Sequence, residues 1–153
     1  PRSDYNYTSS GKLSLALGHL ALFRALLLTN EQEFLVVEDD CFFVPNFKEE
    51  FAKSYAALPP DWEAAYLGYC CVETLTKTPI NDRIAIYRYP LCTHAILYKR
   101  SVLTTFLQRV DVLCEPIDIA FHTLVLPHIN CYCFDPPLAN QRTITGEWAG
   151  ILP

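Results

Sequence analysis

"FLVVEDDCFF", residues 34–43, joins a short apolar run to three adjacent carboxylates, Glu38, Asp39 and Asp40. The first four residues are all apolar, so we expect a strand over residues 33–38 that is buried on both faces and central in its sheet. Three neighbouring negative charges beside a buried strand repel one another and lose hydration. Some other group must compensate them, and the nature of that group bears on function.

The segments around this run alternate between helical and strand patterns. Apolar spacing predicts a helix over residues 12–28, capped by the serines at 9–10, and a second helix over 44–58, capped by Asn46. The remaining elements expected are strands at 62–69, 84–89, 93–99 and 131–135, helices at 100–110 and 115–126, a polar loop at 72–83 and an irregular tail at 136–153. This alternation predicts one α/β layered domain, with ligands beyond the carboxyl ends of the strands.

The composition is that of a folded domain without a nucleic-acid footprint. The chain has 153 residues, 51% of them hydrophobic, which suffices for a real core and excludes disorder as the main state. The net charge of −5 provides no basic stripe, so we expect no nucleic-acid partner. The apolar stretch at residues 20–28 contains a charged residue and is too short to span a bilayer, so we expect no transmembrane segment.

The spacing of the three carboxylates suggests a cation site. Side chains alternate along a strand, so Glu38 and Asp40 should share one face while Asp39 points to the other. Two carboxylates on one face are hard oxygen ligands that suit Mg²⁺ or Mn²⁺. The alternative is that these are ordinary acids that cap a helix or stay hydrated in a loop.

The cysteine pattern leaves more than one interpretation open. The seven cysteines include an adjacent pair at 70–71 and a "CYC" stretch at 131–133, which fit neither the CxxC spacing of zinc sites nor an even set of disulfides. We expect most of them to be buried free thiols that pack as small apolar residues. A disulfide or a metal site is the alternative.

Seven short motifs follow one another along nearly the whole chain. They are "GKLSLALGH" at 11–19, "FLVVEDD" at 34–40, "PNF" at 45–47, "LPPDWEAAYLG" at 58–68, "CTHAILYKRSV" at 92–102, "EPIDIAF" at 115–121 and "PPLANQRTITGEW" at 136–148. In type and order they resemble glycosyltransferase family 25, which includes lipooligosaccharide and collagen galactosyltransferases. Ser14, Leu15 and Gly18 depart from the family's first motif. We expect residues 1–153 to form a single domain that lacks the family's opening strand–helix units.

The resemblance implies a GT-A-type (Rossmann-like) fold with a mixed, mostly parallel sheet. It also implies transfer of a hexose, galactose or glucose, from a UDP-linked sugar to a glycan, lipid-linked or protein hydroxyl, with inversion. Mn²⁺ or Mg²⁺ held by Glu38 and Asp40 would bridge the donor diphosphate and offset charge on the leaving nucleotide. The alternative function is a non-catalytic, GT-A-like binding or scaffold module. A metal-dependent phosphoesterase would need more His or Asp ligands than the sequence offers.

The same resemblance implies roles for individual residues. Asp118 matches the family's Pro-x-Asp and is the expected base that deprotonates the acceptor hydroxyl, with Glu115 as the second candidate. The alternative is that Asp118 only caps its helix. Four further residues within matched motifs are expected to bind the nucleotide-sugar donor: His19, Asp39, His94 and Gln141. A structural histidine is the alternative for His19 and His94, a metal role is also open for His94, and Gln141 could instead contact the acceptor.

Overall fold

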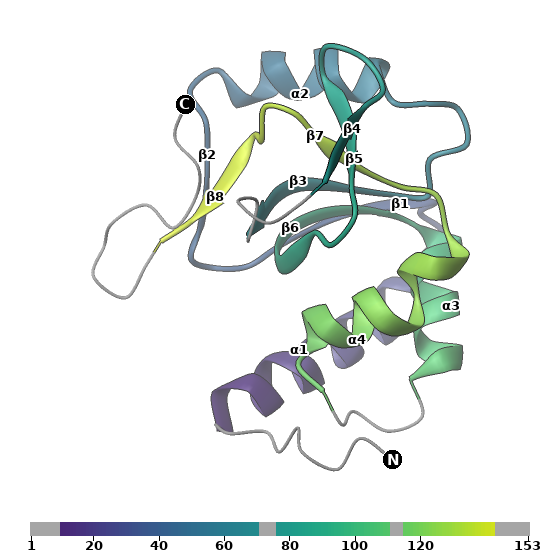
Figure 1. Cartoon of the computed structure of the whole chain (residues 1–153). Helices are drawn as coiled ribbons and strands as arrows, with labels where there is room; N and C mark the ends of the chain where they lie inside the picture. The colour runs from purple at the N-terminus through teal and green to yellow at the C-terminus, as the bar shows by residue number, and fades with distance from the viewer. Residues whose placement is uncertain (1–9, 71–75, 111–114, 143–153) are drawn as a thin grey trace.

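The fold is built on a six-stranded mixed sheet with helices on both faces (Figure 1). The computed structural model describes residues 10–70, 76–110 and 115–142. The elements in chain order are α1 Ser10–Leu26, β1 Glu33–Val37, β2 Cys41–Phe43, α2 Phe47–Ala56, β3 Ala64–Cys70, β4 Lys77–Pro79, β5 Ile84–Tyr87, β6 Leu91–Lys99, α3 Arg100–Arg109, α4 Ile117–Leu124, a 3₁₀ turn at Leu126–His128, β7 Cys131–Phe134 and β8 Ala139–Gln141. The predicted α/β class is therefore confirmed.

The order of the strands differs from the expectation. Within the described residues the order is β1-β6-β3-β7-β5-β4, and only the β3–β7 pair is parallel. The prediction of a mostly parallel sheet is wrong. The reason is that β6 lies between β1 and β3 and runs antiparallel to both. β1 and β3 thus point the same way, as strands joined through a helix commonly do, but they do not pair with each other.

β1 lies at one edge of the sheet. Phe34 and Val36 are buried in the core, whereas Leu35 is 39% and Val37 is 40% exposed. The expectation of a central strand buried on both faces is therefore wrong. Four successive apolar residues suggested two covered faces, but the core covers only the face that carries Phe34 and Val36.

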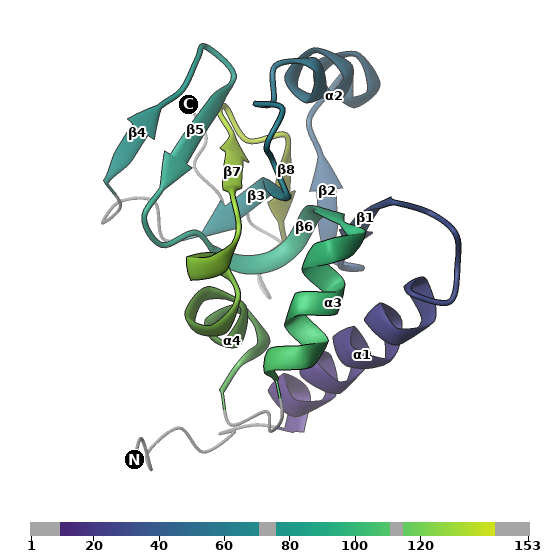
Figure 2. The same cartoon turned by 90° about the vertical axis from the view of Figure 1, so that its right-hand side faces the viewer.

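Two apolar clusters, one on each face of the sheet, form the core. The first joins the sheet to α1, α3 and α4, and within it the rings of Phe23 and Phe106 meet edge to face with centroids 5.3 Å apart. The second joins the sheet to α2, where Phe51 packs against Phe134. Figure 2 shows α1, α3 and α4 grouped away from α2. None of the helices in the described part of the chain combines the length and apolar character needed to cross a membrane.

A small second sheet pairs β2 with β8 and brings residues near 140 back to the acidic triplet. Its antiparallel register places Cys41 opposite Gln141 and Phe43 opposite Ala139. β8 falls in the expected irregular tail and β4 in the expected polar loop, so both expectations are wrong at these residues. Each strand has only three residues, too few for an alternating pattern to show in the sequence, and each forms because a partner strand supplies its hydrogen bonds.

A disulfide joins Cys70, the last residue of β3, to Cys92 near the start of β6. The antiparallel pairing of these strands brings the two Cα atoms to 5.7 Å, a separation that a disulfide spans. The expectation of free thiols is therefore wrong for this pair. Three other described cysteines are free: Cys41, Cys131 and Cys133. Cys71 and Cys114 lie outside the described residues.

Candidate functional site

The three carboxylates lie where β1 ends, beside the first residues of β6. β1 ends at Val37, and the next backbone N–H, that of Glu38, donates to the His94 carbonyl at 2.9 Å. A turn follows, closed by the Cys41 N–H donating to the Glu38 carbonyl at 3.1 Å. The strand thus ends one residue earlier than expected, so strand alternation does not set the directions of the two aspartates.

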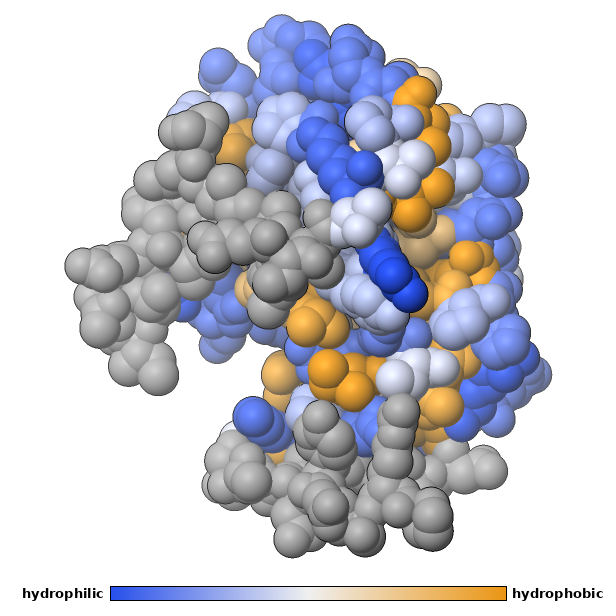
Figure 3. Space-filling model, viewed as in Figure 1, coloured by the Kyte–Doolittle hydropathy of each residue, from blue (hydrophilic) through white to orange (hydrophobic). Residues whose placement is uncertain are grey.

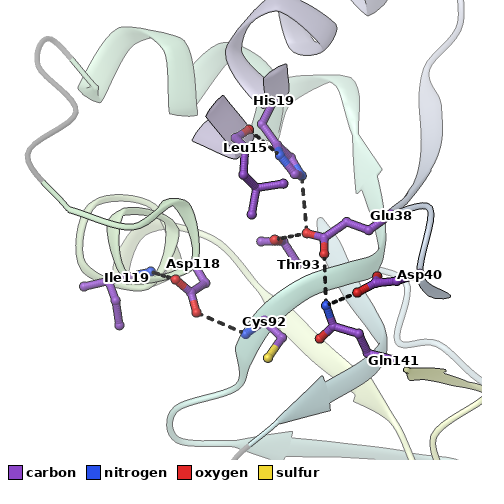
Figure 4. A network of polar contacts seen from close by, with 9 residues as sticks. All are labelled: Leu15, His19, Glu38, Asp40, Cys92, Thr93, Asp118, Ile119 and Gln141. Carbon is purple, nitrogen blue, oxygen red and sulfur yellow. Dashed lines mark hydrogen bonds and ion pairs between the residues drawn. The ribbon is translucent and has the colours of Figure 1, made fainter. Parts of the chain in front are cut away.

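Glu38 has polar neighbours from three distant parts of the chain (Figure 4). The Thr93 hydroxyl donates to Oε1 at 2.5 Å, and the Gln141 side-chain amide donates to Oε2 at 3.4 Å. His19 Nε2 lies 4.0 Å from Oε1, and the Glu38 side chain is only 13% exposed. Burial raises the pKa of Glu38, while the Thr93 hydrogen bond and the nearby His19 act to lower it.

Gln141 joins Glu38 to Asp40. Its Nε2 also donates to Asp40 Oδ2 at 2.8 Å, so one amide nitrogen stands between two carboxylates (Figure 4). The β2–β8 pairing supplies this contact, because Gln141 lies opposite Cys41, the residue after Asp40. Asp39 is exposed, whereas Glu38 and Asp40 are partly buried. The structure thus brings Glu38 and Asp40 together, by a turn and a bridging amide instead of by strand alternation.

His19 faces the carboxylates from α1. Its Nδ1 donates to the Leu15 carbonyl at 3.1 Å, since a carbonyl oxygen can only accept. In the neutral ring Nε2 then carries a lone pair, and this buried atom has no hydrogen-bond partner among the described residues. Nε2 can therefore form an ion pair with Glu38 when the ring is protonated, or act as a ligand when it is neutral.

Asp118 approaches the same place from the first turn of α4. Its Oδ1 accepts from the Ile119 backbone N–H at 2.9 Å, and its Oδ2 accepts from the Cys92 N–H at 3.4 Å (Figure 4). The second bond ties α4 to the start of β6. Glu115 has a different surrounding, because its Oε2 accepts from the Thr123 hydroxyl at 3.4 Å.

Two adjoining hollows open on this cluster. The first, of about 400 Å³, is lined by Asp118, Thr93 and Lys12 among others. The second, of about 440 Å³, is lined by His19 and all three carboxylates. Leu15, Glu38 and Gln141 border both, so the hollows meet at Glu38. The surface in Figure 3 is indented on the left, between the sheet and the α1–α4 helices, on the side toward which β8 ends and α1 begins in Figure 1.

The residues at Glu38 fit a divalent cation. Asp40 Oδ1 is buried and has no hydrogen-bond partner in the described ranges, as is also true of His19 Nε2. A cation would satisfy such an oxygen and would offset the lost hydration of Glu38. Mg²⁺ is usually held by one or two carboxylates together with substrate phosphates. Glu38 and Asp40 provide that number of protein ligands.

His94 is placed differently from the other candidates, because it borders neither hollow. It is 2% exposed, and neither ring nitrogen has a well-aligned hydrogen-bond partner among the described residues. Burial lowers the pKa of His94, against opposing effects of the Ala139 carbonyl and Asp40. Its Nε2 packs so closely on Gly68 that a Cβ there would overlap with it. His19, Asp39 and Gln141 thus border the second hollow, whereas His94 borders neither.

Thr93 is the site residue that sequence reasoning missed. It makes the shortest contact to Glu38, and its position at the start of β6 places it beside the end of β1. The sequence contained one indication, because Thr93 precedes His94 within the "CTHAILYKRSV" motif. The motif predicted a role for His94, whereas it is the preceding residue, Thr93, that contacts Glu38.

No model of a known protein family matches this chain, and no curated protein sequence matches it. The geometry around Glu38 therefore carries the functional proposal.

Proposed function

We propose that this chain is a metal-dependent glycosyltransferase that moves a hexose, galactose or glucose, from a UDP-linked donor to a hydroxyl acceptor with inversion. One observation carries the proposal: Glu38, Asp40 and Asp118 converge on two hollows that meet at Glu38. Such a reaction requires a site for a cation with a diphosphate and a base for the acceptor hydroxyl. Glu38 and Asp40 are carboxylates for the cation site, and Asp118 is a carboxylate for the base.

The second hollow suits the donor diphosphate. Glu38 and Asp40 would hold Mn²⁺ or Mg²⁺ there, and the ion would supply Lewis-acid stabilisation of the leaving nucleotide. The Gln141 amide now stands between these carboxylates, 2.8 Å from Asp40 Oδ2. An amide N–H carries only a partial positive charge, so Gln141 and a cation compete for the same oxygens. His19 lines this hollow, and its buried Nε2, which has no hydrogen-bond partner among the described residues, is a further candidate ligand for the donor or the ion.

The first hollow suits the acceptor, with Asp118 as the base. The Ile119 and Cys92 backbone N–H groups each bond one oxygen of Asp118, which fixes the orientation of the carboxylate. A carboxylate offers about four lone-pair sites, so both oxygens keep capacity to accept a proton. The border shared by the two hollows, at Leu15, Glu38 and Gln141, is where the sugar would pass from donor to acceptor.

A binding module without turnover is the second candidate, and one observation favours it. The hydrogen bonds from Thr93 and Gln141 already compensate Glu38 and Asp40 in part without a cation. A site of this kind could recognise a polar ligand through the same groups. Turnover by the wild-type chain separates the two candidates, because only the transferase releases UDP from a UDP-hexose in the presence of an acceptor.

Isothermal titration of UDP in the presence of Mn²⁺ tests the proposed cation site. Asp40→Asn should abolish Mn²⁺-dependent UDP binding, because a neutral amide is a poor ligand for a hard cation. Glu38→Gln should weaken binding less, since Glu38 also accepts from Thr93. Asp39→Asn is the matched control for the cation, because it removes the same charge from the exposed residue of the same turn and should leave the affinity for Mn²⁺ nearly unchanged.

Two outcomes would contradict the assignment. If Asp39→Asn proves the damaging change, the ligands have been assigned to the wrong residues. If all three variants bind UDP and Mn²⁺ as the wild type does, the triplet is hydrated charge and the transferase proposal loses its basis.

A further inference from the structure

A second cluster of ligand atoms includes Cys92, which also lines the first hollow. Within the described residues, one group of three His, Cys, Asp or Glu side chains has ligand atoms mutually within 4.8 Å, namely Cys70, Cys92 and His94. These residues come from the end of β3 and the start of β6. Two of them are joined in a disulfide, so the third ligand atom, on His94, lies beside that bond.

The buried ring of His94 indicates a ligand site. The ring is 2% exposed, and neither nitrogen has a well-aligned hydrogen-bond partner in the described part of the chain. A buried polar group without a hydrogen-bond partner costs free energy. A native structure that retains such a group often uses it to bind a ligand or an ion. The strand backbone around His94 is already paired, because its carbonyl accepts from the Glu38 N–H.

The surroundings of His94 suit an imidazole ligand. His94 lies two residues from Cys92 on β6, and its neutral imidazole has one lone pair to offer a metal. The Ala139 carbonyl packs against Gly68 beside Nε2. A metal-bound histidine commonly directs its other N–H at a backbone carbonyl, and Ala139 provides one.

Cys92 carries a second unusual feature. Its φ is 67°, in the left-handed region that a non-glycine residue rarely adopts. Such a conformation persists only where the surrounding structure holds it, and it occurs often at ligand sites. Here it turns a sulfur toward Cys70 and leaves the backbone N–H with Asp118.

We propose that the reduced protein binds one Zn²⁺ ion through the Cys70 and Cys92 thiolates and one ring nitrogen of His94. Two thiolates and an imidazole are borderline-soft donors typical of Zn²⁺, unlike the oxygen ligands at Glu38 and Asp40. Tetrahedral zinc with Zn–S bonds of about 2.3 Å needs sulfurs roughly 3.8 Å apart, so the disulfide must open first. Water completes the fourth position. The zinc proposal does not rest on the proposed transferase activity, although the Cys92 N–H also donates to Asp118.

Opening the disulfide requires a two-electron reductant. A phosphine and one water molecule convert the disulfide to two thiols and a phosphine oxide. Zn²⁺ then binds as both thiols lose their protons to solvent. Oxidation of the two thiolates by a small-molecule disulfide removes two electrons, restores the Cys70–Cys92 bond and releases Zn²⁺. Bound zinc and the disulfide are therefore mutually exclusive.

The test measures zinc in oxidised and phosphine-reduced protein after incubation with Zn²⁺ and desalting. The reduced wild type should retain about one zinc per chain, and the oxidised protein less than about a tenth as much. Co²⁺ in place of zinc should give the thiolate-to-cobalt absorption of a tetrahedral site. Zinc should raise the melting temperature of the reduced protein and leave that of the oxidised protein unchanged.

Variants locate the ion. Cys92→Ser and His94→Ala should lower zinc retention at least about tenfold, since each removes one ligand. Cys131→Ser is the control, because it removes another free thiol and should retain zinc fully. Equal zinc in oxidised and reduced protein, full retention by Cys92→Ser, or no zinc and no cobalt–thiolate absorption in the reduced wild type would overturn the proposal. The wild-type comparison needs no substitution, so a variant that fails to fold does not affect it.

Discussion

Replacing Thr93 with valine removes one hydroxyl from a buried carboxylate and keeps the shape of the side chain. Thr93 is 4% exposed and donates to Glu38 at 2.5 Å, so water has little access to replace the bond. A hydrogen bond to a charged group contributes about 1.5–3 kcal/mol, and we expect Thr93→Val to lower the free energy of unfolding by that amount at mildly alkaline pH. In a chain of this length the melting temperature should fall by roughly 3–12 °C.

The loss should depend on pH in a defined direction. Burial raises the pKa of Glu38 and the Thr93 bond opposes that effect, so removing the hydroxyl raises this pKa further. The bond favours the ionised carboxylate over the neutral acid. Its stabilising contribution is therefore full above the Glu38 pKa of the variant and shrinks as pH falls through the Glu38 pKa of the wild type.

Denaturant unfolding of Thr93→Val and wild type across this pH range measures both effects. Thr104→Val is the matched control, because the Thr104 hydroxyl is exposed and donates only to the Arg100 carbonyl within α3. The control should change the free energy of unfolding by less than about 0.5 kcal/mol at every pH. If Thr93→Val costs no more than the control, or costs the same at every pH, the account of how Glu38 is compensated is refuted.

Three further changes test the site and its support. Asp118→Asn should lower the rate of hexose transfer at least about a hundredfold and leave UDP binding, measured by titration, nearly intact. Glu115→Gln should lower the rate less. An equal loss of UDP binding and transfer rate in Asp118→Asn would make Asp118 a structural cap. Gly68→Ala should lower the free energy of unfolding by about 1–3 kcal/mol, because the added Cβ would overlap with a buried histidine and a β8 carbonyl; an unchanged denaturation midpoint would contradict this. Reducing the Cys70–Cys92 disulfide in metal-free protein should lower the free energy of unfolding by about 3 kcal/mol, because the bond closes a loop of sequence separation 22. An unchanged denaturation midpoint after reduction would contradict this prediction.

Elements with strong local periodicity were predicted well. The helix expected over 12–28 is observed at Ser10–Leu26, and the strand expected over 93–99 is observed at Leu91–Lys99. Asn46 does precede α2, but in a left-handed conformation with φ 58° and without a side-chain cap bond. Periodicity within one segment is set by that segment's own residues, which explains these successes.

The pairing of two strands depends on both of them and cannot be deduced from the sequence of either one. The predictions that required such pairing were wrong. Nothing in the four apolar residues before Glu38 indicates that β6 would insert beside them and leave β1 at an edge. The disulfide follows from the β3–β6 register, which contains irregularities near Gly68. Glu38 and Asp40 do lie together, but the expected reason, strand alternation, was replaced by a turn and by Gln141.

The contact between Gln141 and Glu38 spans 103 positions in the chain, and that between Gln141 and Asp40 spans 101. A chain made from its amino end releases both carboxylates long before the glutamine that bridges them. Contacts between distant positions require closure of long loops, and they form slowly. We expect Glu38 and Asp40 to stay hydrated while the helices form and to lose water only when β8 docks on β2. A ligand that binds at Glu38 would therefore bind fully folded chains in preference to chains in which β8 has not yet paired with β2.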